Sequence, residues 1–400
     1  MSNIIQIKAP IIRDNNIISQ QYHTYTPYTQ SYENNDEIRI AIQSQDLNVL
    51  PSESYLFIEF EAKRSGTTVS TQKVKFNPFY LAHLFSEMRY ELNGVEIDRC
   101  KTPGITSALK TMIACKSSDL SLYYLYRLNE EVDILQTTYS LILPLRFIFG
   151  FCDDYNKIIL NSKHELIIIR NRIDSGLCSS ESDSEVFKFN VTKIHWKIPH
   201  IKLSDEGRLL TLKSIERDDS IPMAYRSWDL YDLPVVPQAR RNIWKVKTTT
   251  QLTKPRFVVV AFQTITDPCK NVSEFSHCNI SDVKLYLNDE RYPYDNLNTS
   301  FSQSRYQELY HTFLKIHQSY YNDGNPNAAG VNFHDFKNGS TIFPFDCSRS
   351  DERHKNGTID VLIEIESNRN IPENTKAYCL IIHDNLVRYS PLTNFVRREF

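Results

Sequence analysis

Two stretches of the sequence, MRYELNG at residues 88–94 and VKLYLND at residues 283–289, align with each other without a gap. In both, apolar and polar residues alternate, which is typical of a strand with one buried face. Each stretch then runs into an Asn-Gly or Asn-Asp dipeptide, which tolerates positive φ and closes a two-residue hairpin. The alternation resumes at Ile97 and at Tyr292, so we expect a returning strand in both places.

The elements on either side of the two hairpins follow the same order. Upstream of each hairpin lie an amphipathic strand and a strongly apolar strand, EIRIAI and YLFIEFEA in the first copy and NIWKVKTT and RFVVVAFQ in the second. Downstream come a helical region, a proline-bearing segment (LPLRFIFGF or TIFPFDCS), an apolar strand (ELIIIR or VLIEIE) and a closing strand (VTKIHWKI or KAYCLIIH). The hairpins lie about 195 residues apart, an ordinary domain length.

Alternating strands can resemble one another by chance, but chance does not explain the shared order of elements. The sequence therefore predicts two tandem β-sandwiches of one topology. Sandwiches with long helical insertions between strands are typical of jelly rolls. We expect an all-β fold with helical insertions, that is, a double jelly roll.

Periodicity places the individual elements. The strands are expected at residues 37–42, 55–63, 166–169, 187–191, 243–248, 257–262, 361–365 and 378–382. The helices are expected at residues 105–112, 120–128 and 305–319. In FKFNVTKIHWKI the apolar phase slips between Val191 and Ile194, which predicts a β-bulge near Thr192.

The duplication divides the chain into five parts. We expect an N-terminal arm (1–36), a first jelly roll (37–203), an interdomain connection (204–237), a second jelly roll (238–390) and a C-terminal tail (391–400). The prolines of IPMAYRSWDLYDLPVVP suit an extended linker packed on the first sandwich. The tail, ending in VRREF, is short and polar, and it could dock on a neighbour or fray.

Composition favours a folded, globular protein. The 400 residues are 41% hydrophobic and 24% charged, with a formal net charge of −2, so nothing in the balance demands a nucleic-acid or membrane partner. The first 36 residues contain only Lys8 and Arg13 as cations, which argues against a genome-packaging arm. The longest apolar run, residues 139–151, is interrupted by Pro144 and Arg146, so no transmembrane segment is expected.

The thiols and the N-terminus indicate synthesis in the cytosol. The eight cysteines are scattered without a CxxC, and free thiols are the expected state. The N-terminus lacks the charged start, unbroken apolar core and cleavage site of a signal peptide.

Catalytic and metal-binding patterns are scarce. His195 and His200 straddle Pro199 and do not share a strand face, and the chain has no His-x-His of the kind that a cupin metal site uses. No second Cys/His pair at ligand spacing accompanies His277-Cys278. We therefore expect no catalytic residues, no cofactor and no metal, and interpret these histidines as buried or surface groups.

The acidic and basic segments of the sequence are also interpreted as structural features rather than as functional sites. Asp153-Asp154 and Asp218-Asp219 are expected to serve as turn and cap residues rather than as catalytic acids. The acidic serine loop at 179–185 could bind Ca²⁺ or be phosphorylated, but a solvated loop is the interpretation adopted here. In the basic stretch 240–256, apolar and basic residues alternate, so Trp244 is expected to point into the core and the basic side chains to form one solvent-exposed face. A solvent-exposed strand face explains these charges, and no sequence-specific nucleic-acid binding is expected.

Longer segments of the chain resemble a known family. They are the run LPLRFIFGFCDDYNKIILNSKHELIIIRN (143–171), KIHWKIPHI, IPMAYRSWD, PRFVVVAFQT, FSHCNISDVKLYLNDERYPYDN, SRSDERHKNGTIDVLIEIE and IPENTKAYCLIIHD. Across about residues 35–390 the chain is similar to the double jelly-roll major capsid proteins of double-stranded DNA viruses and of Polinton-like (Maverick/adintovirus-type) elements of invertebrates.

The resemblance implies a structural, non-enzymatic role. Members form homotrimers with a pseudo-hexagonal outline, which tile an icosahedral shell together with minor capsid and penton proteins. It implies a virion protein made in the host cytoplasm, with the host nucleus a candidate compartment for assembly. No functional residue carries over, because function in this family lies in shape and contacts. The compact length leaves little room for tower loops.

Two other classes remain open from the sequence. A tandem β-sandwich that binds a receptor or glycan, as in a spike or lectin, would show a concave aromatic site and no tendency to form shells. A jelly-roll enzyme of the cupin or glycosidase kind would need a convergent metal or carboxylate cluster.

Overall fold

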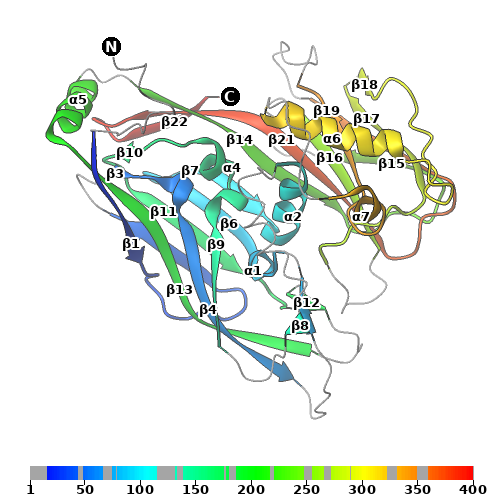
Figure 1. Ribbon diagram of the computed structural model, residues 1–400, viewed down its shortest axis with the longest axis horizontal. Coiled ribbons are helices and arrows are strands. Elements are labelled where there is room, and N and C mark those ends of the chain that lie inside the picture. The colour runs from blue at the N-terminus through cyan, green and yellow to red at the C-terminus, as the bar shows by residue number, and fades with distance from the viewer. Residues whose placement is uncertain are drawn as a thin grey trace, which may run out of the picture.

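The closing strand of each half of the chain organises the sheet in which it lies (Figure 1). In the computed structural model, β13 (Val186–Leu203) pairs antiparallel with β1 (Ile17–Tyr25) along one side and with β4 (Tyr55–Ser65) along the other. β4 pairs in turn with β9 (Thr138–Pro144). The structure describes residues 16–43, 48–65, 74–77, 79–114, 131–132, 138–174, 177–179, 186–216, 220–246, 255–264, 272–288, 290–321, 331–348 and 359–399.

A second antiparallel sheet faces the first one. Its strand order is β2-β11-β6-β7. Its strands are β2 (Glu37–Ile42), β11 (His164–Arg170), β6 (Phe85–Leu92) and β7 (Val95–Lys101). Tyr90 on β6 and Trp196 on β13, both fully buried, meet edge to face with ring centroids 5.8 Å apart. The two sheets therefore enclose one core.

The second half repeats this arrangement strand for strand. Its sheets have the orders β14-β21-β16-β19 and β15-β20-β17-β18. The strands are β14 (Ile221–Leu233), β15 (Arg241–Val246), β16 (Pro255–Thr264), β17 (Ile280–Leu287), β18 (Glu290–Tyr292), β19 (Ile342–Asp346), β20 (Val361–Ser367) and β21 (Thr375–Ser390). Each half is thus a jelly roll, and the predicted double jelly roll is confirmed. We call the halves the first and second jelly rolls.

Shorter elements fill the connections. The strands are β3 (Asn48–Val49), β5 (Val74–Phe76), β8 (Glu131–Val132), β10 (Ile159–Leu160), β12 (Cys178–Ser179) and β22 (Phe395–Glu399). The helices are η1 (Pro51–Glu53), α1 (Tyr80–His83), α2 (Pro103–Ala114), η3 (Leu145–Phe147), α4 (Gly150–Asp154), α5 (Asp205–Glu216), α6 (Gln307–Tyr321) and α7 (Phe333–Lys337). Within the described part of the chain, none of the helices combines the length and apolar character that crossing a membrane requires.

Both predicted hairpins are confirmed. β6 and β7 are joined by Asn93 and Gly94, whose φ angles of 50° and 79° are the left-handed pair that a tight hairpin requires. Leu287 pairs with Glu290 across the second turn, where Asn288 has φ 51°. The same turn chemistry thus closes the same strand pair in each jelly roll.

Replacing Gly94 by alanine should lower the free energy of unfolding by about 1 kcal/mol. No atom would lie within 4 Å of the added Cβ, so the cost is conformational and comes from the positive φ. Urea denaturation measures it, with Gly94→Asn as control, because asparagine tolerates this conformation and should lose less. Equal losses for the two variants would contradict the conformational explanation.

The other local predictions have mixed outcomes. The register between β13 and β4 shifts between Val191 and Lys193, so the bulge at Thr192 is confirmed. α2 and α6 occupy the first and third predicted helices. The helix predicted at 120–128 lies outside the described residues.

The expected boundaries differ from the structure at three places. The arm 1–36 contains β1, and the connection 204–237 contains β14, which is the equivalent first strand of the second jelly roll. β14 is therefore no linker: it pairs with β21 along thirteen residues. The tail 391–400 contains β22, which also pairs with β21. The sequences of these three segments show only a weak strand pattern. Each becomes a strand because it pairs with a long neighbouring strand, β13 or β21.

Candidate functional site at the joint between the jelly rolls

Helix α4 of the first jelly roll lies directly against β14 of the second (Figure 1). The approach is closest at Gly150, where an added Cβ would lie 1.6 Å from the backbone oxygen of Arg226 and 2.7 Å from Nε1 of Trp228. Only glycine allows the two backbones to meet this closely. The sequence thus encodes a contact that fixes the distance between the jelly rolls.

An ion pair locks α4 to β14 at the same point. The Asp154 carboxylate accepts hydrogen bonds from Arg226 through its backbone N (2.9 Å), its Nε (2.8 Å) and a terminal guanidinium nitrogen. Burial acts to raise the pKa of Asp154, but the hydrogen bonds and charge of Arg226 hold it below its ordinary value. Arg226 also donates to the Tyr320 carbonyl on α6 at 2.6 Å and covers the Tyr320 ring at 3.5 Å, so it ties three elements together.

A second buried cation lies beside the first. Lys110 on α2 is 2% exposed; its Nζ is 3.4 Å from the Asp153 carboxylate and 5.0 Å from the centre of the Trp228 ring. Lys110 also donates to the Arg146 carbonyl. A buried charge is tolerated only when it is paired in this way. Trp228, itself 2% exposed, is therefore sandwiched between the jelly rolls.

The Ile97 carbonyl on β7 receives two hydrogen bonds from the second jelly roll. Tyr225 on β14 donates to it at 2.6 Å and Arg398 on β22 at 2.5 Å. The adjoining Asp98 side chain accepts from the Phe151 backbone N at 2.9 Å, and burial raises the pKa of Asp98 to about 6. The second jelly roll therefore binds this edge strand of the first jelly roll through the Ile97 carbonyl.

The C-terminal residues belong to the same joint. Tyr389 donates to the Leu160 and Asn161 carbonyls at 2.6 and 2.8 Å. The side-chain amide of Asn93, in the first hairpin turn, donates to the Asn394 carbonyl at 3.0 Å. The C-terminal segment therefore docks on the first jelly roll of its own chain, which is neither of the two fates expected for it.

A buried histidine closes the opposite side of the joint. His83 on α1 contacts the Ser273 hydroxyl of the second jelly roll at 3.0 Å through its Nε2. Gly104 leaves room for the imidazole, because a Cβ there would lie 2.2 Å from His83 Nδ1. Burial lowers the pKa of His83 to about 4, so the ring is neutral at pH 7.

Acid should weaken the joint through His83. An unfolded histidine titrates near pH 6.5, so the stability that the neutral ring supplies is complete above that pH and is lost as pH falls towards about 4. Between pH 7.5 and 5 the loss should be about 2 kcal/mol. Urea denaturation of the protein and of His83→Gln at both pH values isolates it. A variant that loses as much stability as the parent would contradict this assignment.

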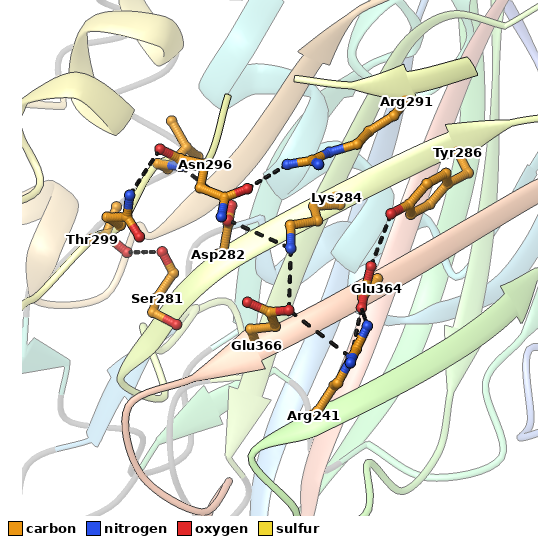
Figure 2. Close-up of polar contacts among 12 residues, drawn as sticks. Arg241, Ser281, Asp282, Lys284, Tyr286, Arg291, Asn296, Thr299, Glu364 and Glu366 are labelled. Carbon is orange, nitrogen blue, oxygen red and sulfur yellow. Dashed lines mark hydrogen bonds and ion pairs between the residues drawn. The ribbon is translucent and has the colours of Figure 1, made fainter. Parts of the chain in front are cut away.

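Outside the joint, the outer face of the β15-β20-β17-β18 sheet carries a network of charges (Figure 2). Glu364 accepts from Arg241 Nε at 2.7 Å and from the Tyr286 hydroxyl at 2.9 Å. Burial favours a higher pKa for Glu364, but these two donors hold it below its ordinary value. Lys284 bridges Glu366 at 3.1 Å and Asp282 at 4.0 Å. Each of these carboxylates therefore has at least one cationic partner.

The corresponding face of the first jelly roll is built in the same way. Glu87 on β6 pairs with Arg89 at 3.2 Å and with Arg99 on β7 at 2.7 Å. Lys163 pairs with Glu165 at 3.0 Å. Exposed ion pairs contribute little stability. They make both outer faces polar, with acidic and basic side chains paired within each face.

Comparison with known proteins decides the family. Residues 74–387 match the family described as the double jelly roll-like domain. The chain belongs to the double jelly roll-like domain family. No curated protein matches the sequence.

Solved capsid structures share the fold. Similar chains occur in the 3.5 Å cryo-EM structure of the Sputnik virophage (TM-score 0.68, 9% identity, 99% of this chain and 91% of that chain covered) and in the quasi-atomic model of the PBCV-1 virus capsid (0.59, 12%, 98% and 99%). The mavirus major capsid protein is similar too (0.57, 11%, 100% and 93%). Identities this low establish the double jelly-roll fold alone.

The double jelly roll keeps the candidate chemical residues apart. His195 stacks on Phe57 with centroids 6.2 Å apart, whereas His200 stacks on His23 at 4.0 Å. His277 stacks on Phe301 at 4.4 Å beside the buried Cys278. The described residues contain no group of three or more His, Cys, Asp or Glu side chains placed to hold a metal ion.

Charged segments singled out in the sequence also have structural partners. Trp244 points into the core and is 7% exposed, as alternation predicted, while Arg241 pairs with Glu364 and Arg256 with Asp384. Residues 247–254, most of the acidic loop (180–185) and Asp218-Asp219 lie outside the described residues.

Sequence reasoning missed the joint itself. Asp153-Asp154 was interpreted as a turn or cap pair, yet both carboxylates form buried ion pairs, with Lys110 and Arg226. The sequence contains only a weak signal for this joint, which is the position of Gly150 three residues before Asp153-Asp154 in the otherwise apolar stretch FIFGFCDD.

Proposed function

We propose that this chain is the major capsid protein of a double-stranded DNA virus or virophage-like element, with a structural and not an enzymatic role. The observation that carries the proposal is the pair of jelly rolls, whose main strands follow the same order and which are held by one buried joint. Two similar units in a fixed relation give three copies six similar corners, so a threefold ring acquires a hexagonal outline. Jelly-roll capsid proteins with the same fold, in the Sputnik and PBCV-1 particles, support this assignment.

The finer parts of the proposal follow from it. The chain forms homotrimers that tile an icosahedral shell, minor capsid or penton proteins close the gaps, and the virion is its destination. A Polinton-like source, synthesis in the host cytoplasm and assembly in the host nucleus belong to the same proposal. The two units are inferred to span 17–203 and 221–399, with α5 as the connection.

Sedimentation velocity of the purified chain tests the proposal. A species of three chains, or larger regular assemblies, is expected at micromolar concentration. A monomer at every salt concentration and pH would overturn the capsid role and favour the alternative of a receptor- or glycan-binding module.

A further inference from the structure

Strand β1 is the first strand of the first jelly roll, and among the described strands it pairs with β13 alone. None of its nine residues is fully buried, whereas the equivalent strand β14 buries Met223, Tyr225 and Trp228. Strands that bury little apolar surface open locally at a low free energy. The attachment of β1 therefore depends on a small number of side-chain contacts.

One histidine of β13 supplies two of these contacts. The ring of His200 stacks on His23 of β1, with centroids 4.0 Å apart and planes inclined by 23°. Its Nε2 lies 3.0 Å from the Tyr25 hydroxyl, which is also on β1. His200 is only 9% exposed, and β1 contributes to that burial. Detaching β1 therefore uncovers the His200 ring.

The two stacked rings cannot both take up protons without repelling each other. Burial, together with the charge of His23, lowers the pKa of His200 to about 4. A third histidine, His164 of β11, lies between the hydroxyls of Tyr90 and Ser162, each 2.7 Å from one of its ring nitrogens. Burial, together with the charge of His200, lowers the pKa of His164 to about 3. The rings of His200 and His164 are therefore neutral at pH 7.

Among the described residues, the elements packed around these rings supply no carboxylate that faces them. β1 contains no Asp, Glu, Lys or Arg, and the nearest charged side chain along β13 is the cation Lys202. The acidic residues of β2, β6 and β11 alternate onto the opposite face of their sheet, as Glu165 does, which pairs with Lys163 at 3.0 Å. Glu53 of η1 is bound to Gln20. The two tyrosines beside the rings stay neutral, because burial raises the pKa of each.

The second jelly roll provides a counterion at the corresponding strand pair. His383 of β21 is 4% exposed, and its Nε2 lies 2.8 Å from the carboxylate of Asp229 on β14. Burial acts to raise the pKa of Asp229, but the hydrogen bond and charge of His383 hold it below its ordinary value. A proton on His383 is therefore balanced, whereas a proton on His200 is not. The two jelly rolls thus differ in how their first strands respond to acid.

We propose that the stack of His23 and His200 is an acid-sensitive latch, which holds β1 on β13 at neutral pH and releases β1 when the two rings take up protons. Release leaves the backbone groups of residues 196–203 without their partners on β1, so acid opens one edge of this sheet. The latch lies within one chain and does not depend on the proposed capsid function.

Hydrogen exchange of the full chain tests the latch. The neutral His200 ring stabilises attached β1 fully above about pH 6.5, where an exposed histidine titrates, and this stabilisation is lost as the pH falls towards about 4. Between pH 7.5 and 5, the population with β1 detached should rise about tenfold. The amides of residues 17–25 should lose protection by that factor, after correction for the intrinsic pH dependence of exchange. A β1 that is as protected at pH 5 as at pH 7.5 would overturn the proposal.

Two variants should abolish this change. His23→Asp places a carboxylate beside His200, as Asp229 lies beside His383, and His23 is exposed, so no core is disturbed. His200→Gln removes the titrating ring. In both variants β1 should keep its protection at pH 5, and circular dichroism at both pH values establishes that each is folded. A folded His23→Asp protein that loses as much protection as the parent would also overturn the proposal.

Two further histidine variants serve as matched controls. His195→Gln alters the opposite face of β13, where His195 stacks on Phe57. His83→Gln alters the joint, whose response to acid is separate from that of β1. Both control proteins should lose β1 protection between pH 7.5 and 5 as the parent does. A β1 that no longer responds to acid in His83→Gln would assign the effect to the joint and contradict the latch.

Discussion

Asp154→Asn is expected to lower the free energy of unfolding by about 3 to 5 kcal/mol, because it leaves the Arg226 guanidinium buried without its counterion. Both side chains are largely buried, 13% exposed for Arg226 and 15% for Asp154. Arg226 remains bound to the Tyr320 carbonyl, so it cannot simply turn into solvent. Urea denaturation followed by tryptophan fluorescence measures the loss, and Trp228 lies beside the altered group.

Two controls separate pairing from generic damage. Lys193→Met removes an exposed pair with Glu59, in which Lys193 is 54% exposed, and should cost no more than about 1 kcal/mol. The double variant Asp154→Leu, Arg226→Met removes both charges and should be more stable than Asp154→Asn. If Asp154→Asn loses no more than Lys193→Met, the joint is not held by this pair.

The second large effect is expected at Gly150. Gly150→Ala would place a methyl group 1.6 Å from the Arg226 carbonyl oxygen, and backbone on both sides leaves no flexible group to yield. The cost should reach about 3 kcal/mol, the upper end for overpacking. Gly150 opens α4 and is not among the residues with positive φ. Alanine would otherwise favour the helix, so the clash alone opposes it.

Calorimetry measures the melting temperature of Gly150→Ala, and limited proteolysis measures how easily the chain is cleaved between the jelly rolls. We expect a lower melting temperature and faster cleavage between the jelly rolls. Gly94→Ala is the matched control, since its cost is conformational and no atom lies near the added carbon. A Gly150→Ala protein as stable as the parent would mean that the jelly rolls are not set by this contact.

These two effects bear on the proposed function because the joint sets how the two jelly rolls are oriented. The proposed hexagonal tile requires the two jelly rolls to keep one orientation, and a mobile linker would not provide it. β14 meets that need by belonging to one sheet while packing on the other jelly roll. The fold thus converts a duplicated sandwich into one rigid unit.

Local patterns predicted much of the fold. The hairpins at Asn93 and Asn288, the bulge at Thr192 and the repeated strand order depend on residues close in sequence, and periodicity or turn chemistry reports them directly. The two first strands were missed for opposite reasons. β1 is exposed on both faces and shows no alternation, whereas β14 begins with Ile221-Pro222 and looks like a linker.

The joint could not be predicted from local patterns. Asp154 and Arg226 are 72 residues apart, and nothing in either neighbourhood identifies the partner of the other. Long-range pairings of this kind require the structure.

Electron microscopy of the purified chain tests the central claim most directly. Class averages of negatively stained particles should show a threefold particle with six similar lobes, two from each chain. Particles with two lobes only, at every concentration and salt condition, would contradict the account of this chain as a self-assembling capsid tile.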